Sequence, residues 1–203
     1  TYSLVNDKTN KQFTVLNKEG IEEVSILMPL TEDRKTLRFN LMASNIEALK
    51  YNLARKNKNI ANFEISRVYY KHEGGKYEDL HLAIVMANEY ASTLWQGKSE
   101  TVDFFLLKGI VNQVFEKLGL TAKYVVLDKE CKELHPNRSA LIYVNDTLVG
   151  YIGQLHPQYE KANDLDDTYV CEINLQDIIN YQKDTVIFTP IQKLPSVERD
   201  LAL

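Results

Sequence analysis

Alternating and helical patterns of hydrophobic residues divide the chain into a series of short strands and helices. The clearest pattern covers residues 134–158, where two apolar segments flank the pair Asn145-Asp146. Asn and Asp tolerate positive φ, so this pair predicts the two-residue turn of a β-hairpin. Both segments are apolar on both alternating faces, which is typical of strands inside a sheet rather than at its edge. Gly150 and Gly153 predict close approach by a neighbouring group, and Pro157 suits the first turn of a helix.

Similar patterns predict further strands on both sides of this hairpin. We expect them at residues 2–6, 13–16, 22–28, 62–70, 81–86, 124–127 and 169–173, where apolar residues alternate or β-branched and aromatic residues gather. Gly74-Gly75 lies between two of these strands and predicts a second hairpin turn rather than a phosphate-binding loop, because no helix follows it closely.

Apolar residues at helical spacing predict two main helices. The first stripe consists of Leu37, Leu41, Ile46, Leu49 and Leu53, and the second runs through residues 104–118. Such stripes usually face a core and sometimes face a partner.

Capping residues mark the ends of several helices. Asp103 is placed as the N-cap of the second helix and Gly119 as its C′ residue. Trp95 and Gly97 fall in the loop before it. Shorter helices are expected at residues 159–163 and 175–181, the latter capped by Asn174, with an acidic turn at residues 164–167.

Composition describes an ordinary globular protein. The 203 residues are 44% hydrophobic and 26% charged, and no apolar run is long enough to span a bilayer. Without a secretory pattern, we expect a soluble cytoplasmic protein with no membrane partner. Cys131 and Cys171 lie far apart and outside any CxxC pair, which favours two reduced thiols over a disulfide or metal site. The net charge of −4 lacks the basic excess of a dedicated nucleic-acid-binding domain.

The chain has no self-evident active site. It contains no GxxxxGK, GxGxxG, HExxH or GxSxG motif. His135 and His156 both precede proline without a ligand cluster nearby, which favours structural or surface roles. Carboxylates at Glu64 and Glu73, and in the acidic turn, show no spacing that defines an acid–base pair. From the residues alone, we expect an α+β domain with an antiparallel sheet flanked by helices.

Five segments, in order, resemble the β subunit of bacterial phenylalanyl-tRNA synthetase. They are TYSLVN (1–6), LRFNLMASNIEALKYNLARKN (37–57), FEISRVYY (63–70), LHPNRSA followed by VGYIGQLHP (134–157), and PSVERDLAL (195–203). The resemblance implies a domain similar to a class II aminoacyl-tRNA synthetase core over residues 1–185. Residues 186–203 would then begin a ferredoxin-like anticodon-binding domain.

The resemblance also implies a division of labour between subunits. In this family the α subunit adenylates phenylalanine with ATP and Mg²⁺ and charges tRNA(Phe). The class II-like region of the β subunit is noncatalytic and packs against α in an (αβ)₂ heterotetramer. We therefore expect no catalytic, cofactor-binding or metal-binding residue in this chain. The helix at residues 37–53 and the exposed parts of the helix at residues 104–118 are the candidate contact surfaces for α.

Two positions support catalytic silence. Tyr70 stands where a working class II core has the arginine of an Arg-x-Glu element, and residues 168–177 contain neither the glycine nor the arginine of the corresponding nucleotide-binding strand. Losing both cations removes stabilisation of charge on transferring phosphates.

Two alternatives remain open. One is a degenerate stand-alone adenylating ligase. The other is a tRNA-contacting module that uses the basic residues Lys50, Arg55, Lys56, Lys58 and Arg138. A solvated cluster at the C-terminal end of a helix also accounts for the first four of these cations.

Overall fold

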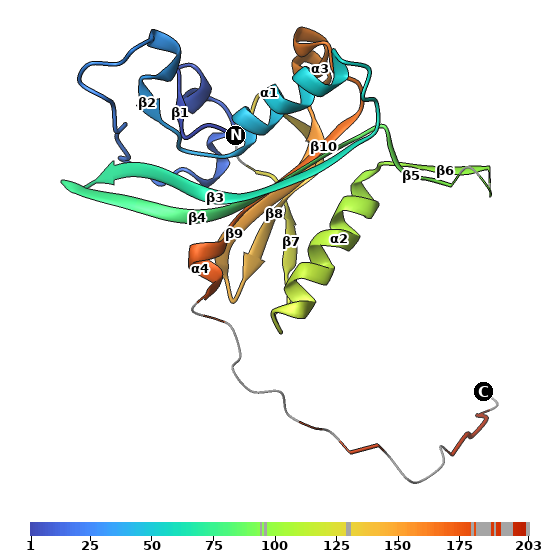
Figure 1. The fold of residues 1–203 in the computed structure, drawn as a ribbon. Helices are drawn as coiled ribbons and strands as arrows, with labels where there is room; N and C mark the ends of the chain where they lie inside the picture. The colour runs from blue at the N-terminus through green and yellow to red at the C-terminus, as the bar shows by residue number, and fades with distance from the viewer. Residues whose placement is uncertain are drawn as a thin grey trace.

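A six-stranded antiparallel sheet forms the centre of the protein (Figure 1). The structure is a computed structural model, and it describes residues 1–93, 95, 97–128, 131–179, 181, 188, 190, 191 and 197–201. The strand order is β3-β4-β10-β9-β8-β7. These strands are β3 (Ile60–His72), β4 (Gly75–Ala87), β7 (Lys123–Val126), β8 (Leu134–Val144), β9 (Thr147–Leu155) and β10 (Thr168–Asn174). Two small pairs accompany the sheet, β1 (Leu4–Val5) with β2 (Thr36–Leu37), and β5 (Glu89–Thr93) with β6 (Lys98–Thr101).

Helices cover both faces of the sheet (Figure 1). They are α1 (Met42–Leu53), α2 (Phe104–Lys117), α3 (Pro157–Asn163) and α4 (Leu175–Ile179), with short 3₁₀ turns at Thr9–Lys11, Thr14–Leu16 and Glu32–Arg34. Alternate residues of a strand point to opposite faces, so the sheet separates two cores. One core packs α1 and the N-terminal segment (residues 1–41) against one face of the sheet, called the upper or α1 face here. The other core packs α2 and α4 against the opposite, lower face. The expected α+β fold is confirmed.

The central hairpin forms as its sequence predicts. Asn145 and Asp146 have φ of 47° and 62° and connect β8 to β9, both of which lie inside the sheet. The two glycines are needed for close packing between strands. A Cβ on Gly150 would lie 2.7 Å from the Glu172 carbonyl oxygen, and one on Gly153 would collide with the side chain of Ser139.

The predicted helix ends are also confirmed. Asp103 Oδ1 accepts a hydrogen bond of 2.7 Å from the Leu106 amide. Gly119 follows α2 with φ of 69°, and Pro157 occupies the first turn of α3. Asn174 Oδ1 accepts a hydrogen bond of 2.9 Å from the amide of Gln176 in α4.

Predictions for the N-terminal segment were less accurate. Residues 13–16 form the 3₁₀ turn Thr14–Leu16 rather than a strand, because Phe13 and Val15 turn into the core. Residues 22–28 make only two isolated bridges, Glu22 with Lys71 and Ser25 with Thr36.

The first long helix also begins later than its apolar stripe suggested. Leu37 belongs to β2, and α1 starts at Met42, where Asn40 Oδ1 accepts a hydrogen bond of 3.2 Å from the Ala43 amide. The β3–β4 turn is centred on Glu73 and Gly74, which have positive φ, one residue before the predicted pair.

The β5–β6 hairpin and the end of α4 also differ from the expected elements. The β5–β6 hairpin was not predicted, although Trp95 and Gly97 lie between its strands as part of the expected loop. α4 ends at Ile179, and residue 180 lies outside the described residues. The proposed boundary between residues 185 and 186 also lies outside them and stays a prediction. In the described part of the chain, no helix has the length and hydrophobicity to cross a membrane.

The cap of α2 can be tested by substitution. Asp103→Ala removes the acceptor for the Leu106 amide, so the free energy of unfolding should fall by about 1 kcal/mol. Asp103→Asn keeps a capping oxygen and should remain close to the parent. Urea unfolding followed by circular dichroism measures both. Equal stability of the Ala variant and the parent would show that this cap contributes nothing.

Candidate functional site

Tyr70 and residues 168–177, which the resemblance to a class II core singled out, meet at one place on the α1 face of the sheet. Tyr70 on β3 and Asn174 on β10 line the same cavity, with β4 between the two strands. This cavity has a volume of about 20 Å³. Its other walls come from the sheet and from the N-terminal segment, through Leu16, Asn17, Lys18, Ile21, Phe39, Val68, Asp79 and His81.

Lys18 supplies a cation beside Tyr70, but a carboxylate already pairs with it. Lys18 Nζ donates to the Tyr70 hydroxyl at 2.9 Å, and that hydroxyl donates to Asp79 Oδ2 at 2.9 Å. Lys18 Nζ lies 3.5 Å from the same carboxylate. Burial lowers the pKa of Lys18, but the hydrogen bond with Tyr70 and the charge of Asp79 outweigh it and leave the pKa above its ordinary value. Burial raises the pKa of Tyr70, so this hydroxyl stays protonated.

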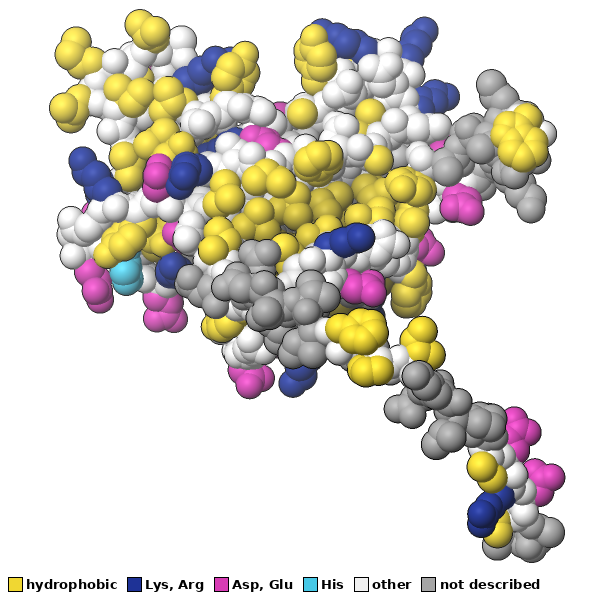
Figure 2. All heavy atoms as spheres, turned by 60° about the horizontal axis from the view of Figure 1, so that its bottom comes forward, with side chains coloured by type: hydrophobic (Ala, Val, Ile, Leu, Met, Phe, Trp, Pro, Cys, Tyr) yellow, Lys and Arg dark blue, Asp and Glu magenta, His cyan; other side chains and the backbone are white. Residues whose placement is uncertain are grey.

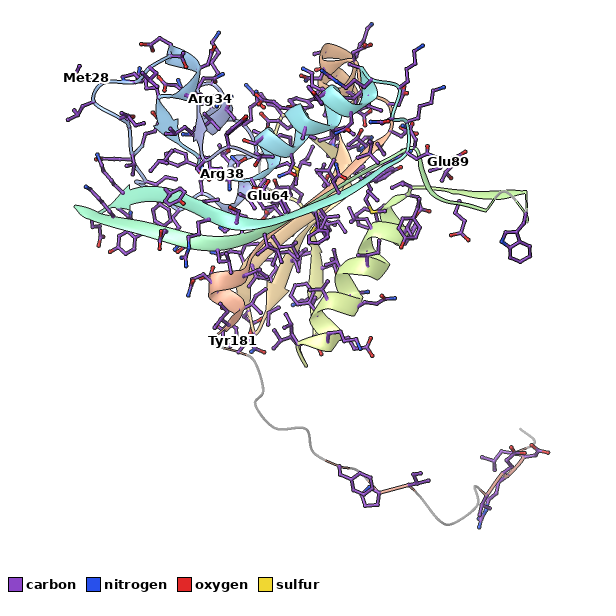
Figure 3. The ribbon with its side chains drawn as sticks, viewed as in Figure 1. Met28, Arg34, Arg38, Glu64, Glu89 and Tyr181 are labelled. Atoms are coloured by element: carbon purple, nitrogen blue, oxygen red, sulfur yellow. The ribbon has the colours of Figure 1, made fainter. Side chains whose placement is uncertain are left out.

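Arg38 is the second cation on this face, and only 1% of it is exposed. Its guanidinium lies against β3, where Nη1 is 3.1 Å from Glu64 Oε1 and Nη2 donates to Ser66 Oγ at 2.6 Å (Figure 3). Nε donates to the Arg67 carbonyl at 3.1 Å. A guanidinium engaged on all three nitrogens fastens the segment before α1 to β3. It is not free to bind a phosphate.

Glu172 on β10 holds the middle of the same face and is fully buried. Oε1 accepts a hydrogen bond of 2.9 Å from the Leu41 amide, at the start of α1, and lies 2.8 Å from His81 Nδ1. The Tyr151 hydroxyl donates to Oε2 at 3.2 Å. Burial, and then the negative charge of Glu172, raise the pKa of Tyr151 well above its ordinary value, which keeps this donor protonated. A carboxylate at a helix N-terminus is favourable because of the exposed amides and the helix dipole.

These residues do not fit ATP or Mg²⁺. Pockets for small ligands usually measure roughly 300–1,000 Å³, whereas this cavity measures about 20 Å³. Phe13, Val15, Leu41 and Met42 are buried against the sheet on this face. The described residues also contain no cluster of three or more His, Cys, Asp or Glu side chains that could hold a metal ion.

Other candidates from the sequence have local structural roles. His135 Nδ1 accepts from the Asn137 amide, and His156 Nδ1 from the Gln158 amide, both at 3.1 Å. Each histidine thus makes a hydrogen bond to the backbone two residues further along the chain. Glu73 lies exposed in the β3–β4 turn. Both cysteines are free thiols.

The structure does not bring all five basic residues considered for tRNA contact together. Arg138 donates to Gln154 Oε1 at 2.8 Å and lines a groove with α2, on the lower face. The other four lie in or after α1, on the upper face. Among them, Lys50 Nζ donates to Asn163 Oδ1 at 3.0 Å, and the guanidinium of Arg55 stacks over the Tyr51 ring.

Sequence reasoning missed Arg38, Glu172 and His81, which organise this face. One signal was present for Glu172, since it is the only charged residue in the strongly apolar strand at residues 169–173. A charged residue in a buried strand is rarely tolerated without partners. The partners themselves lie far away in the sequence.

Comparison with known proteins identifies the family. The model of the phenylalanyl tRNA synthetase beta chain CLM domain matches residues 1–175. The chain belongs to this family. Among curated relatives of the CLM domain chain, the phenylalanine–tRNA ligase beta subunit of Bacillus licheniformis is 42% identical over 205 residues, and that of Staphylococcus aureus is 39% identical. Both alignments cover 100% of this chain and 25% of the relative, so the chain spans about a quarter of their length.

A solved structure confirms the fold of this CLM domain chain. Pyrrolysyl tRNA synthetase of Desulfitobacterium hafniense matches with a TM-score of 0.59 and 13% sequence identity. The match covers 89% of this chain and 60% of the other. The expected similarity to a class II synthetase core, and the resemblance read from the sequence, are both confirmed.

The Glu172 network makes a specific prediction for stability. In Glu172→Gln one acceptor oxygen becomes an amide donor, which faces the donors of Leu41, His81 or Tyr151. The free energy of unfolding should fall by about 3 kcal/mol, because a buried donor loses its acceptor. Denaturant unfolding monitored by fluorescence measures the change.

Glu78→Gln provides the matched control. Glu78 is half-exposed and pairs with Arg67 on the surface, so its replacement should change the stability by less than about 1 kcal/mol. If both variants lose the same small amount, the buried carboxylate does not stabilise this face.

Proposed function

We propose that this chain is a catalytically silent core within the β subunit of phenylalanine–tRNA ligase, and that it supports assembly with the catalytic α subunit in an (αβ)₂ enzyme. ATP, Mg²⁺, phenylalanine and tRNA(Phe) would be substrates and cofactors of the whole cytoplasmic enzyme, acting at sites outside this chain. The observation that carries the proposal is the filled α1 face, where a cavity of about 20 Å³ remains between Tyr70 and Asn174.

Lys18 and Arg38 both support a noncatalytic role. Lys18 is neutralised by Asp79, and Arg38 is held by Glu64 and by neighbouring oxygens. Catalysis of adenylation requires positive groups that are free to meet the charge developing on the phosphates. Freeing Lys18 or Arg38 for this task would require breaking the ion pairs and hydrogen bonds that hold the N-terminal segment on the sheet. No observation favours a stand-alone ligase or a tRNA-binding module over the structural role.

The apolar stripes of the two long helices are occupied by the core. Leu49 of α1 and Leu107, Val111 and Phe115 of α2 are at most 1% exposed. These buried residues are therefore not available to a partner, whereas the exposed sides of both helices are. Exposed side chains outside the stripes have to supply the contact surface.

The lower face of β3, which faces away from α1, carries exposed apolar side chains. Phe63 and Ile65 are 71% and 54% exposed. Their register partners on β4, Ile84 and Leu82, continue the same face. Figure 2 turns this side forward and shows hydrophobic side chains gathered across its middle. Exposed apolar patches of this kind often mark protein interfaces, so we propose the Phe63–Ile65 surface as the contact with α.

Phe63→Glu tests this assignment. The change places a charge on the apolar surface, so the affinity of an intact β subunit for α should fall by roughly tenfold or more. Co-purification followed by light scattering measures the assembly. Tyr51→Glu, at an exposed position of α1 on the opposite face, is the matched control and should assemble normally. Normal assembly of a folded Phe63→Glu variant would contradict the assignment.

A further inference from the structure

A separate groove lies at the far edge of the sheet, between the first turn of α2 and strands β7 and β8. Its volume is about 500 Å³, and its lining includes Phe104, Phe105, Lys108, Tyr124, Val126 and Arg138. Two of the apolar residues are largely uncovered, since Phe105 is 75% exposed and Val126 is 72% exposed. The groove thus offers an apolar floor and rim that the described part of the chain does not cover.

The groove runs beside an open strand edge. β7 is the last strand of the sheet and, among the described residues, pairs only with β8. The backbone N–H and C=O groups on its outer side can therefore pair with an added strand. An extended segment placed there would lie along the groove, with alternate side chains directed towards Val126 and Phe105.

Charge indicates the chemistry of the occupant. Lys108 Nζ lies 4.6 Å from the centre of the Tyr124 ring, and Arg138 donates to the neutral side chain of Gln154. Within the described chain, neither cation lies in a salt bridge. One carboxylate, Asp103, also lines the groove, and its Oδ1 caps α2. Two cations against one carboxylate leave the lining with an excess of positive charge, which fits an apolar segment that carries a carboxylate.

A second copy of this chain is a poor occupant. Pairing β7 with β7 would bring the strand sequence Lys123-Tyr-Val-Val against itself, with no carboxylate in either strand. The cations Lys108 and Arg138 of both copies would then approach one another unpaired. Like charges that meet across an interface disfavour that pairing.

We propose that this groove binds an extended segment of the catalytic α subunit, which adds to β7 as a strand. Its apolar side chains contact Phe105 and Val126, and its carboxylate lies between Lys108 and Arg138. The proposal rests on the proposed assembly function and deepens it. The groove and the Phe63–Ile65 surface belong to the same α2-bearing face of the sheet, so one partner can contact both.

Site-specific photo-crosslinking tests the occupant. A benzoylphenylalanine placed at Val126 of an intact β subunit, co-expressed with α, should crosslink to α. The same probe at Tyr51, which is exposed on α1, is the control and should give no such product. Crosslinks from position 126 only within β or between β subunits would overturn the proposal. Absence of any crosslink in a complex that assembles would also overturn it.

Charge reversal tests the chemistry of recognition. The double variant Lys108→Glu, Arg138→Glu should bind α roughly tenfold more weakly, whereas Lys117→Glu, at the other end of α2, should bind normally. Unchanged affinity of the folded double variant overturns the groove assignment alone, provided that the parent β subunit assembles with α. Failure of the parent to bind α would instead overturn the proposed function.

Discussion

The buried carboxylate of Glu172 is the interaction on which the α1 face of the sheet depends. It connects β10 to the start of α1 through the Leu41 amide, to β4 through His81 and to β9 through Tyr151. An ionised carboxylate in a low-dielectric core is costly unless several donors satisfy it. The geometry of these elements is therefore coupled, because displacing α1 would leave the charge without part of its solvation.

This coupling fixes the packing of the N-terminal segment and α1 on a sheet with a class II synthetase fold. The N-terminal segment closes the small cavity between Tyr70 and Asn174, and α1 packs beside it on the same face of the sheet. The N-terminal segment covers this face and is held at two places. One is the ion pair of Arg38 with Glu64, and the other is the hydrogen-bonded chain of Lys18, Tyr70 and Asp79. Cations, carboxylates and a histidine are all present, yet each contacts another group of the chain. These groups stabilise the packing of the N-terminal segment and α1 on the sheet, and the proposed assembly surface lies on the opposite face.

Features encoded by a few adjacent residues were predictable from the sequence. The Asn145-Asp146 turn, the Asp103 cap and Pro157 in the first turn of α3 each depend on local backbone chemistry. The family resemblance singled out Tyr70 and residues 168–177, but no sequence pattern showed what fills the space between them. The Leu41 and Glu172 partners are 131 residues apart. The strand predicted at residues 13–16 failed for a related reason, since tertiary burial of Phe13 and Val15 overrides the local preference.

The most direct test of the central claim is a titration of the isolated chain with ATP and Mg²⁺, followed by backbone amide chemical shifts. The filled face predicts no saturable shifts at Tyr70, His81 and Glu172 at millimolar ATP. Saturable shifts centred on these three residues would contradict the account. They would show that the N-terminal segment moves away from the sheet to admit a nucleotide.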